Sequence, residues 1–470
     1  MPPDRPIALH TPVDRPPDDL ARLVGAMHAP ALLESGPGLG PHARWSVYAA
    51  EPRLVFEATG TEWTLRDAHG TRRSGRADPL ASLGELIVGL GLARSSTPTI
   101  ADAPHFRGGL IGFYGYDLAP RLEKLPRRHP ADSKIPDIRF GLYDTAVIHD
   151  HARGTSTLLA VDFLNEGEPA VRERTTRWRR LLGKSARTPH GSVVRRDATR
   201  SSLSGLAYQG AVRRALNYIR AGDVFQVNLS RRVSAIGRYD PLDIYLRLRR
   251  VNPAPQAAFL RWDDLAVASA SPEIFFSTRG DRIRTRPIKG TRPRGANPAE
   301  DDVLVDDLLE SEKDRAELTM IVDLERNDLG RICEYGSVRV AEAHAVETFA
   351  HVHHLVATVE GSLRPDVGPT DVIAATFPGG SITGAPKIRA MEIIDELEPF
   401  RRSLYTGAIG YYSLGGTSAF NIAIRTILIE GERASYQVGG GIVADSSPEG
   451  EYAETVAKGR GLQAVLEGAS

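Results

Sequence analysis

Strand-like alternation of apolar and polar residues marks the first part of the chain, up to about residue 180. It covers residues 45–49, 53–57 and 141–149, with clusters of turn-forming residues in between. No period of three to four residues dominates this region, so a long helix is not expected there. We therefore predict that residues 1–182 fold largely as paired strands.

The helical period becomes clear after residue 203. Apolar residues recur at three-to-four spacing before Gly222, namely Tyr208, Val212, Ala215, Leu216 and Ile219. Further helices are expected at 301–329, 370–377, 386–397 and 448–466. Strands are expected at 224–233, 257–261, 265–269, 274–278, 422–429 and 434–438. Strands that pair through turns, with helices set apart from them, predict the α+β class.

Residues 183–202 separate these two parts. They are polar and basic and show almost no apolar periodicity, which makes them the best candidate boundary between residues 1–182 and 203–470. Their arginines are compatible with a nucleic-acid patch or with an exposed linker. The linker is favoured, because no aromatic residues are interleaved for stacking on bases.

Composition and charge exclude several classes of protein. The chain has 470 residues, of which 41% are hydrophobic and 25% charged, as is usual for a folded globular protein. Lys and Arg number 59, as do Asp and Glu, so we expect neither nucleic acid nor a membrane surface as partner. The single cysteine excludes internal disulfides, and no apolar run is long enough to span a bilayer. The N-terminal residues are rich in proline and acidic side chains, so a cytoplasmic protein is expected.

Lys289 is the first candidate for chemistry. It lies between Ile288 and Gly290 in the segment PIKGTRPR, just after the strand-like residues 281–286. An amine becomes nucleophilic when burial or a cationic neighbour lowers its pKa, and a short bend that faces a cavity can provide that environment. The alternative is an ordinary solvated loop lysine.

Two predicted helices carry acidic pairs at helical spacing. Asp314 and Glu317 share one helix face, and so do Glu451 and Glu454, with Lys458 one turn further on. Each pair alone is typical of a solvated helix edge. Together they can offer carboxylates from two helices to one Mg²⁺ ion that faces an anionic ligand.

Two glycine-rich segments follow. The segment FPGGSITGAPK at 377–387 superficially resembles a phosphate-binding loop, but Ala385 and Pro386 separate its last glycine from the lysine, so we reject that reading. We expect Thr383 and Gly384 to cap a helix that opens at Pro386. Gly439, Gly440 and Gly441 are expected to end a strand, where their amides form either a nest for a carboxylate or simply a tight turn.

The motifs of the chain resemble those of the chorismate-utilising enzymes. They are, in order, SASPEIFF, PIKGT, KDRAELTMIVDLERNDLGR, HHLVATVEG, FPGGSITGAPK, GAIGYYS, NIAIRTI and GGGIVADSSPEGEYAET, and they cover residues 269–458 densely. The resemblance continues upstream through FRGGLIGFYGYDL and GDVFQVNLSRR. It implies a large α+β unit in which two antiparallel sheets form a sandwich flanked by helices, with the active site in the cleft between the sheets.

The resemblance also distinguishes activities within the family. Relatives that add water to chorismate carry a lysine where this chain has Gln226, and a neutral amide cannot deprotonate water. Anthranilate synthases carry alanine where this chain has Lys289, whereas aminodeoxychorismate synthases carry lysine. The chain therefore is most similar to the aminodeoxychorismate synthase branch, which serves 4-aminobenzoate and folate biosynthesis, with anthranilate synthesis as the alternative. In that branch Lys289 would attack the chorismate ring, and Glu273 would act as general acid and base.

Further roles are implied by the same resemblance. Glu317 and Glu454 would ligate Mg²⁺, with Asp314 and Glu451 nearby. The carboxylate on the chorismate ring would meet Lys458 and the amides of residues 439–441. The enolpyruvyl carboxylate and the ring would meet four further side chains, namely Arg425, Tyr411, Thr383 and His354. Without the motif, His354 would be interpreted as a satisfied core histidine.

Partners can be inferred as well. Cys333, in the segment RICEYG, lacks the small-residue turn and the downstream histidine of a glutaminase nucleophile. The resemblance therefore implies a separate glutamine amidotransferase subunit that supplies ammonia. Residues 32–35 and 44–46 resemble the tryptophan pocket of the family, although a buried strand is an equal interpretation.

Overall fold

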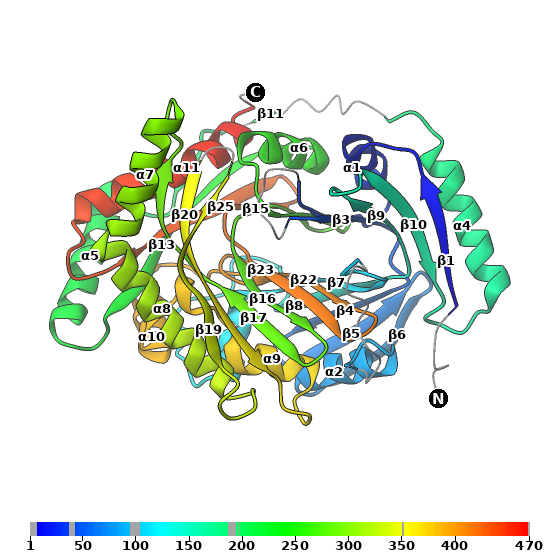
Figure 1. The fold of residues 1–470 in the computed structure, drawn as a ribbon, viewed down its shortest axis with the longest axis horizontal. Coiled ribbons are helices and arrows are strands. Elements are labelled where there is room, and N and C mark those ends of the chain that lie inside the picture. The colour runs from blue at the N-terminus through cyan, green and yellow to red at the C-terminus, as the bar shows by residue number, and fades with distance from the viewer. Residues whose placement is uncertain are drawn as a thin grey trace.

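Two large β-sheets stack face to face at the centre of the molecule, and helices cover their outer faces (Figure 1). The computed structural model describes residues 7–36, 43–94, 104–186, 194–195, 197–349 and 352–468. Every strand pairing in these ranges is antiparallel. The predicted α+β class and two-sheet antiparallel architecture are thus confirmed.

The first sheet has 13 strands in the order β1-β10-β9-β3-β2-β14-β15-β24-β25-β13-β11, with β12 and β21 also paired to β13. Its strands are β1 Ala8–Val13, β2 Ala31–Glu34, β3 Trp45–Ala49, β9 Thr145–Asp150, β10 Thr155–Val161, β11 Val194–Arg195, β12 Arg200–Ser201, β13 Gln226–Arg238, β14 Gln256–Arg261, β15 Ala266–Ser271, β21 Gly384–Ala385, β24 Thr426–Glu430 and β25 Arg433–Ile442.

The second sheet has 12 strands in the order β18-β20-β17-β16-β23-β22-β7-β8-β4-β5-β6, with β19 also paired to β20. Its strands are β4 Leu54–Thr59, β5 Glu62–Asp67, β6 Gly70–Arg76, β7 Gly109–Tyr114, β8 Ile138–Tyr143, β16 Ile274–Arg279, β17 Arg282–Arg286, β18 Ile288–Pro293, β19 Arg339–Thr348, β20 Val352–Ser362, β22 Ala408–Ser413 and β23 Thr417–Ile422. Strands β7 and β8 are buried along their whole length. They lie mid-sheet with both faces covered, which explains their nearly continuous apolar sequence.

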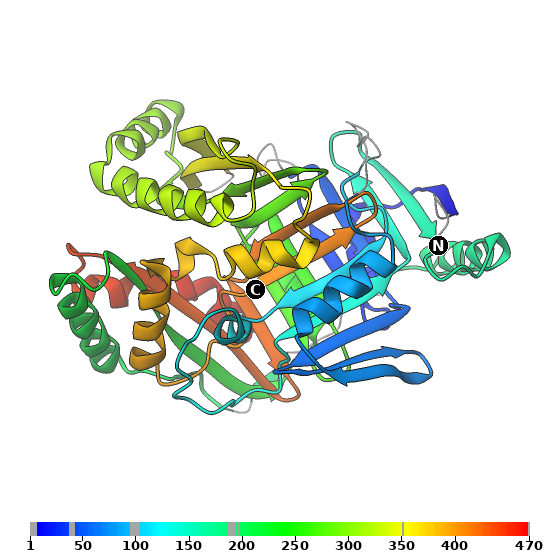
Figure 2. The same cartoon turned by 90° about the horizontal axis from the view of Figure 1, so that it is seen from below.

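Helices form the outer layers. They are α1 Pro17–Gly25, α2 Pro79–Gly89, α3 Ala119–Leu122, α4 Glu168–Leu182, α5 Gly205–Arg220, α6 Pro241–Val251, α7 Pro298–Glu310, α8 Glu312–Gly330, α9 Pro369–Thr376, α10 Lys387–Leu397 and α11 Pro448–Leu466, with single 3₁₀ turns at Tyr116–Leu118 and Gly380–Ile382. Figure 2 shows α2 and α9 side by side over the outer face of the second sheet. No helix in the described ranges has both the length and the apolar character needed to cross a membrane.

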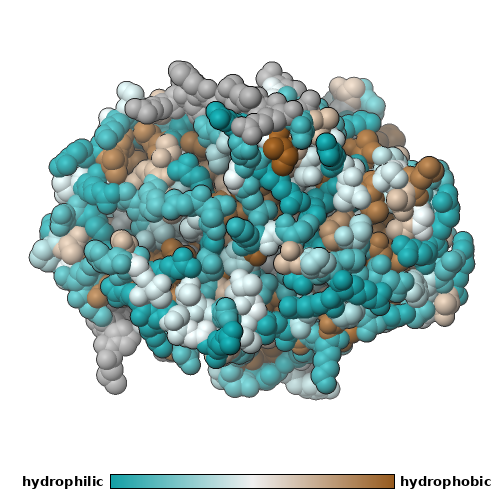
Figure 3. All heavy atoms as spheres, turned by 180° about the vertical axis from the view of Figure 1, so that it is seen from behind, coloured by the Kyte–Doolittle hydropathy of each residue, from teal (hydrophilic) through white to brown (hydrophobic). Residues whose placement is uncertain are grey.

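Apolar side chains fill the space between these layers. One cluster lies between the two sheets and includes Ile111, Phe113 and Val267. Larger clusters join each sheet to the helices outside it. The face of the molecule in Figure 3 is largely hydrophilic, with its hydrophobic residues in small groups.

The two parts of the sequence share both sheets. Residues 1–182 contribute β1 to β10, and residues 203–470 contribute β13 to β25, so each sheet contains strands from both parts. Within the expected linker, residues 187–193 and 196 lie outside the described residues. Strands β11 and β12 from the same stretch pair with β13.

Three expected elements are wrong in their extent. The helix expected at 301–329 is two helices, because the Ser311 hydroxyl accepts a hydrogen bond from the Asp314 amide at 3.2 Å and begins α8. The strand expected at 422–429 is interrupted at Arg425, whose φ is 51°. The strand expected at 141–149 is β8 and β9, which are separated at Asp144.

Candidate active site

Glu273 and Arg425 lie where the chain passes from one sheet to the other. Glu273 separates β15 of the first sheet from β16 of the second, and Arg425 lies between β23 and β24 on the return. Backbone hydrogen bonds join the two crossings to each other's flanking strands. The Ile422 amide donates to the Glu273 carbonyl, and the Ala270 amide donates to the Arg425 carbonyl, each at 3.1 Å. Each crossing thus fixes the position of the other.

Lys289 is part of a strand, and the bend expected there is wrong. It lies in β18, and the pairing of β18 with β20 shifts by one residue between Lys289 and Thr291. Gly290, at that bulge, has a φ of 65°, which favours glycine. The Lys289 side chain is half-buried, and its Nζ lies 3.5 Å from the carbonyl oxygen of Ser381.

Glu273 and Lys289 have shifted pKa values. Burial raises the pKa of the Glu273 carboxyl, although a hydrogen bond of 2.6 Å from the Ser381 hydroxyl and the charge of Lys289 oppose the rise. Burial lowers the pKa of the Lys289 amine, and the charges of Glu317 and Glu273 oppose this shift. Both environments favour the uncharged form. A protonated acid beside an unprotonated amine can perform general acid and nucleophilic chemistry.

Helices α8 and α11 each contribute carboxylates to one region, namely Glu317 from α8 and Glu451 and Glu454 from α11. Glu451 on α11 is buried, and its Oε1 accepts a hydrogen bond from the Ser446 hydroxyl at 2.6 Å. Its Oε2 is buried without a hydrogen-bond partner among the described residues. Burial raises the pKa of Glu451 and of Glu317, and Glu454 adds to both shifts. The three carboxylates therefore share one negative region between the two helices.

This region fits a divalent cation in part. No three His, Cys, Asp or Glu side chains within the described ranges are already arranged around a common metal position. Lys458 Nζ lies 2.6 Å from Glu454 Oε1, and Glu317 has Lys313 at 4.0 Å. The buried oxygen of Glu451 that lacks a partner nevertheless suits a cation, because Mg²⁺ needs only one or two protein carboxylates when water and substrate complete its shell.

Asp314 faces the bulge at Gly290, and its charge also raises the pKa of the Glu317 carboxyl. Its Oδ2 pairs with the Arg292 guanidinium at 3.2 Å, and its carboxyl group lies against Gly290. A Cβ atom at Gly290 would meet the Asp314 Cγ at 2.9 Å. Asp314 thus fixes the bulge beside Lys289 in this structure.

The three glycines lie inside strand β25, and the expectation that they end a strand is wrong. Gly439, Gly440 and Gly441 pair with residues 230, 229 and 228 of β13. A Cβ atom at these positions would meet, in turn, the Tyr405 hydroxyl at 3.0 Å, Glu451 Oε2 at 2.7 Å and Gln226 Nε2 at 3.0 Å. Their missing side chains therefore leave room for polar groups. Lys458 Nζ also reaches this strand, at 3.1 Å from the Gly439 carbonyl oxygen.

His354 and Arg425 bring a neutral ring and a cation to the site. His354 Nδ1 lies 2.9 Å from the Thr291 hydroxyl, and burial, with a contribution from Arg425, lowers the pKa of His354 to about 4. Arg425 is half-buried, and its guanidinium forms no ion pair with a residue in the described part of the chain. A half-buried guanidinium that forms no such ion pair is suited to bind a carboxylate ligand.

Two residues that were predicted to bind the substrate, Tyr411 and Thr383, direct their side chains to groups other than Lys289 and Glu273. Tyr411 lies on β22, packs edge to face on Phe106 at 5.5 Å between ring centroids, and lines a different cavity. The fully buried Thr383 hydroxyl donates to the Gly379 carbonyl at 2.9 Å. The expected cap at Thr383 is also wrong, because α10 begins after Pro386 and its N-terminus has no side-chain cap.

Three further polar residues reach the site, and of these only Gln226 was named from the sequence, as the position that distinguishes the water-adding relatives. Ser381 contacts both Glu273 and Lys289. Tyr405 directs its hydroxyl to Gly439, and both polar atoms of the buried Gln226 amide lack a partner among the described residues. A buried amide without partners is costly unless a ligand or water satisfies it. The sequence signals were the position of Ser381 within FPGGSITGAPK and that of Tyr405 just before GAIGYYS.

The segments that resemble a tryptophan pocket line a cavity of about 360 Å³. Leu33, Glu34 and Ser35 of one segment and Arg44 and Trp45 of the other contribute to its wall. The Glu34 carboxylate already accepts hydrogen bonds from two tyrosines and from an arginine, namely Tyr48, Tyr245 and Arg249. Tryptophan binding stays a prediction.

Comparisons with known proteins agree on one family. The model of the chorismate binding enzymes matches residues 43–464. Aminodeoxychorismate synthase component 1 of Klebsiella aerogenes is 42% identical over 91% of each chain, and that of Escherichia coli is 40% identical over 93% of each chain. Anthranilate synthase component 1 of Thermus thermophilus is 40% identical over 91% of this chain and 90% of its own.

Solved structures have the same fold. Anthranilate synthase component I from Streptococcus pneumoniae superposes with a TM-score of 0.79 at 33% identity, over 89% of this chain and 92% of its own. The isochorismate synthase MenF of Escherichia coli superposes with a TM-score of 0.71 at 18% identity, over 98% of this chain and 95% of its own.

Proposed function

This chain belongs to the family of chorismate binding enzymes, and we propose that it converts chorismate and ammonia into 4-amino-4-deoxychorismate. The match to the family model confirms the family that was predicted from the sequence motifs. The observation that carries the proposed reaction is the half-buried Lys289 amine, whose pKa burial lowers, close to the buried Glu273 acid. Relatives named aminodeoxychorismate synthase component 1, at 40 to 42% identity, support it.

In the first step, the unprotonated Lys289 amine attacks C2 of the chorismate ring. Both ring double bonds shift, the bond between C4 and its hydroxyl breaks, and Glu273 gives its proton to the departing oxygen, which leaves as water. Lys289 remains bonded to C2 as a secondary ammonium group. The enzyme thus replaces one difficult displacement with two easier ones.

In the second step, ammonia attacks C4 and both double bonds shift back. The bond between C2 and Lys289 breaks, and the lysine leaves as a neutral amine. The Glu273 carboxylate accepts the proton that the new ammonium group loses, so Glu273 and Lys289 both return to their starting forms. The product carries the amino group at C4.

Chorismate carries two carboxylates, and different groups would hold each one. Glu451, Glu454 and Glu317 would hold Mg²⁺, which supplies positive charge to the ring carboxylate when it is bound. Lys458, beside the Gly439 carbonyl, adds a second positive charge there. The Arg425 guanidinium and the Tyr405 hydroxyl would bind the enolpyruvyl carboxylate.

Ammonia would come from a separate glutamine amidotransferase subunit. Cys333 is the single cysteine of the chain and is buried, and burial raises the pKa of its thiol to about 11. Such a thiol is almost entirely protonated near neutral pH, whereas a glutaminase needs a thiolate. The relatives' designation as component 1 supports a partner subunit.

Anthranilate synthesis is the second candidate, because anthranilate synthases reach 40% identity. Lys289 argues against it, since anthranilate synthases carry alanine at the matching position. The deciding assay supplies chorismate, Mg²⁺ and ammonium, with and without an added 4-amino-4-deoxychorismate lyase. We expect 4-aminobenzoate only with the lyase. Anthranilate fluorescence without the lyase would establish the second candidate instead.

A further inference from the structure

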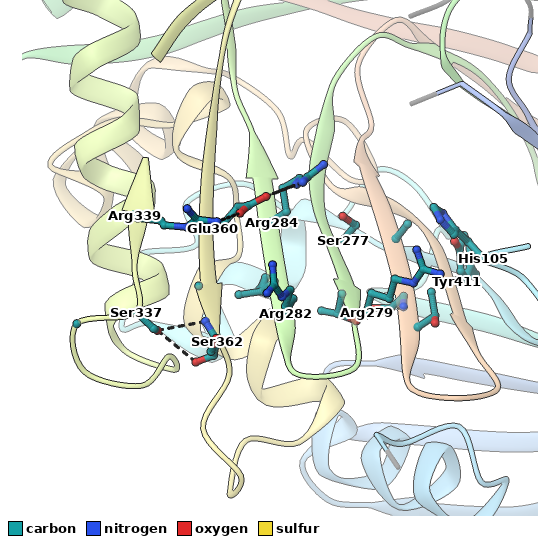
Figure 4. Close-up of a pocket in the computed structure, with 17 residues that line it drawn as sticks. His105, Ser277, Arg279, Arg282, Arg284, Ser337, Arg339, Glu360, Ser362 and Tyr411 are labelled. Carbon is teal, nitrogen blue, oxygen red and sulfur yellow. Dashed lines mark hydrogen bonds and ion pairs between the residues drawn. The ribbon is translucent and has the colours of Figure 1, made fainter. Parts of the chain in front are cut away.

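A second cavity, of about 570 Å³, lies on the second sheet at the turn end of the β16–β17 hairpin (Figure 4). Four arginines contribute to its wall, namely Arg279 on β16, Arg282 and Arg284 on β17, and Arg339 on β19, which is separated from β17 by β20. Neither Lys289 nor Glu273 is among its lining residues. The cavity is therefore distinct from the candidate active site.

The arginines share one face of the sheet because of strand alternation. Arg282 and Arg284 are two residues apart on β17, so their side chains leave the same face. Arg279 on β16 pairs directly with Arg282, which places two like charges opposite each other. Such a pair destabilises a hairpin unless a negative charge offsets it.

The described residues that line the cavity carry more positive than negative charge. Among the described residues that line the cavity, Glu360 is the only carboxylate, and it pairs with Arg284 at 2.5 Å and with Arg339 at 3.1 Å. Arg282 forms no ion pair with a residue in the described ranges. Four arginines and one glutamate leave a formal excess of three positive charges on the wall.

The positive charge of the cavity also affects the pKa values of two neighbouring basic groups, His105 and Arg107. Burial lowers the pKa of Arg107 and of His105, and the charge of Arg279 is the next largest cause of both shifts. His105 also lines the cavity, beside Tyr411. The cavity therefore combines a positive floor with a neutral imidazole and a phenol at one side (Figure 4).

We propose that this cavity binds a small organic polyanion, whose phosphate or carboxylate groups contact Arg279, Arg282 and Arg284. Guanidinium groups match both kinds of anion through paired hydrogen bonds. The volume is within the range of pockets that hold small molecules. Tyr411 and His105 then face the less charged part of the ligand.

The β16–β17 hairpin runs between this cavity and the candidate active site. Glu273 immediately precedes β16, and Lys289 is the second residue of β18, which follows β17 after Pro287. The same hairpin therefore carries the arginines near its turn and leads to the acid and the amine at its open end. Glu273 and Arg279 are six positions apart, which corresponds to about 20 Å of extended strand.

The test is isothermal titration calorimetry of the full chain in metal-free buffer, with pyrophosphate and with citrate as probes. We expect at least one probe to bind. The probe with the lower Kd identifies phosphate or carboxylate as the preferred group. Arg282→Ala should raise its Kd about tenfold, which is the scale of one charge-assisted hydrogen bond. Glu360→Gln should lower its Kd, because this change removes the carboxylate that competes for Arg284 and Arg339.

Two control variants distinguish this cavity from other positive regions. Arg172→Ala removes one exposed arginine on α4, and Arg425→Ala removes the cation of the candidate active site. Both should leave the Kd of the probe unchanged. The proposal is overturned if neither probe binds, if Arg282→Ala has no effect, or if Arg425→Ala alone abolishes binding. These readouts do not depend on which reaction the enzyme catalyses.

Discussion

The Glu273 carboxylate and the Lys289 amine meet the same residue. The Ser381 hydroxyl donates to Glu273 Oε1 at 2.6 Å, and the Ser381 carbonyl oxygen lies 3.5 Å from Lys289 Nζ. Ser381 thus fixes the acid and the amine relative to each other, although the two residues belong to different strands. This arrangement is what a reaction with one nucleophile and one proton donor requires.

Glu273→Gln should lower kcat for 4-amino-4-deoxychorismate formation by about 10²- to 10⁴-fold, the usual contribution of a general acid. Because burial raises the pKa of Glu273, its acid form persists to a higher pH than that of a solvated glutamate. The profile of kcat/KM against pH should therefore have two limbs in the wild type, and the variant should lose one. An unchanged profile would exclude Glu273 as the proton donor.

Tyr405→Phe should raise KM for chorismate by about tenfold or more, because it removes a hydrogen bond to a charged group of the substrate. Tyr411→Phe is the matched control, since Tyr411 is also buried but lines the other cavity. Steady-state kinetics with saturating ammonium measure both. Equal effects, or a larger effect of Tyr411→Phe, would place the enolpyruvyl carboxylate elsewhere.

Gly440→Ala should raise the Mg²⁺ concentration needed for half-maximal rate by about tenfold, the lower end of effects reported for residues around metal ligands. The new Cβ would lie 2.7 Å from Glu451 Oε2 and displace that carboxylate. Gly210→Ala, in helix α5 with no atom within 4 Å of the new Cβ, is the control. If Gly440→Ala kept the wild-type Mg²⁺ dependence, Glu451 would have no part in holding the metal.

Glu325→Gln should change how stability depends on pH. Burial raises the pKa of Glu325 to about 8, and Glu273 adds to the rise, while a hydrogen bond from Thr285 opposes it. The folded chain then holds a proton that the unfolded chain loses above about pH 4.3. The free energy of unfolding should therefore fall as pH rises from about 4.3 to about 8.

Urea unfolding at several pH values across that range measures this effect. The Glu325→Gln variant should lose less stability than the wild type between the two ends of the range. Glu334→Gln, at an exposed position, is the matched control and should follow the wild type. Parallel curves for all three proteins would show that Glu325 titrates normally.

Much of the fold and of the candidate site could be predicted where local pattern determines it. The amphipathic period of α5 and the i, i+3 spacing of the acidic pairs on α8 and α11 need no knowledge of distant residues. The motif around Lys289 singled out this amine, although it lies in strand β18 and not in the expected bend. Its burial, however, arises from long-range packing against the Ser381 segment, 92 residues later.

The errors share a different cause, because each depends on long-range packing or on one backbone angle. Tyr405 and Tyr411 are both buried and are six residues apart, so local sequence does not tell which one points to the glycines of β25. The apolar residues around Arg425 predict one continuous strand, but Arg425 adopts a φ of 51° and lies between two strands. The glycines continue β25 because β13 pairs with them, and that pairing joins residues about 210 positions apart.

The most direct test of the proposed reaction is the intact mass of the purified chain after incubation with chorismate and Mg²⁺ in the absence of ammonia. We predict an increase equal to chorismate minus one water, located on the peptide that contains Lys289 and absent from Lys289→Ala, whose rate with ammonium should fall by about a hundredfold or more. The contradictory result is an unmodified Lys289 peptide together with undiminished ammonia-dependent turnover in Lys289→Ala.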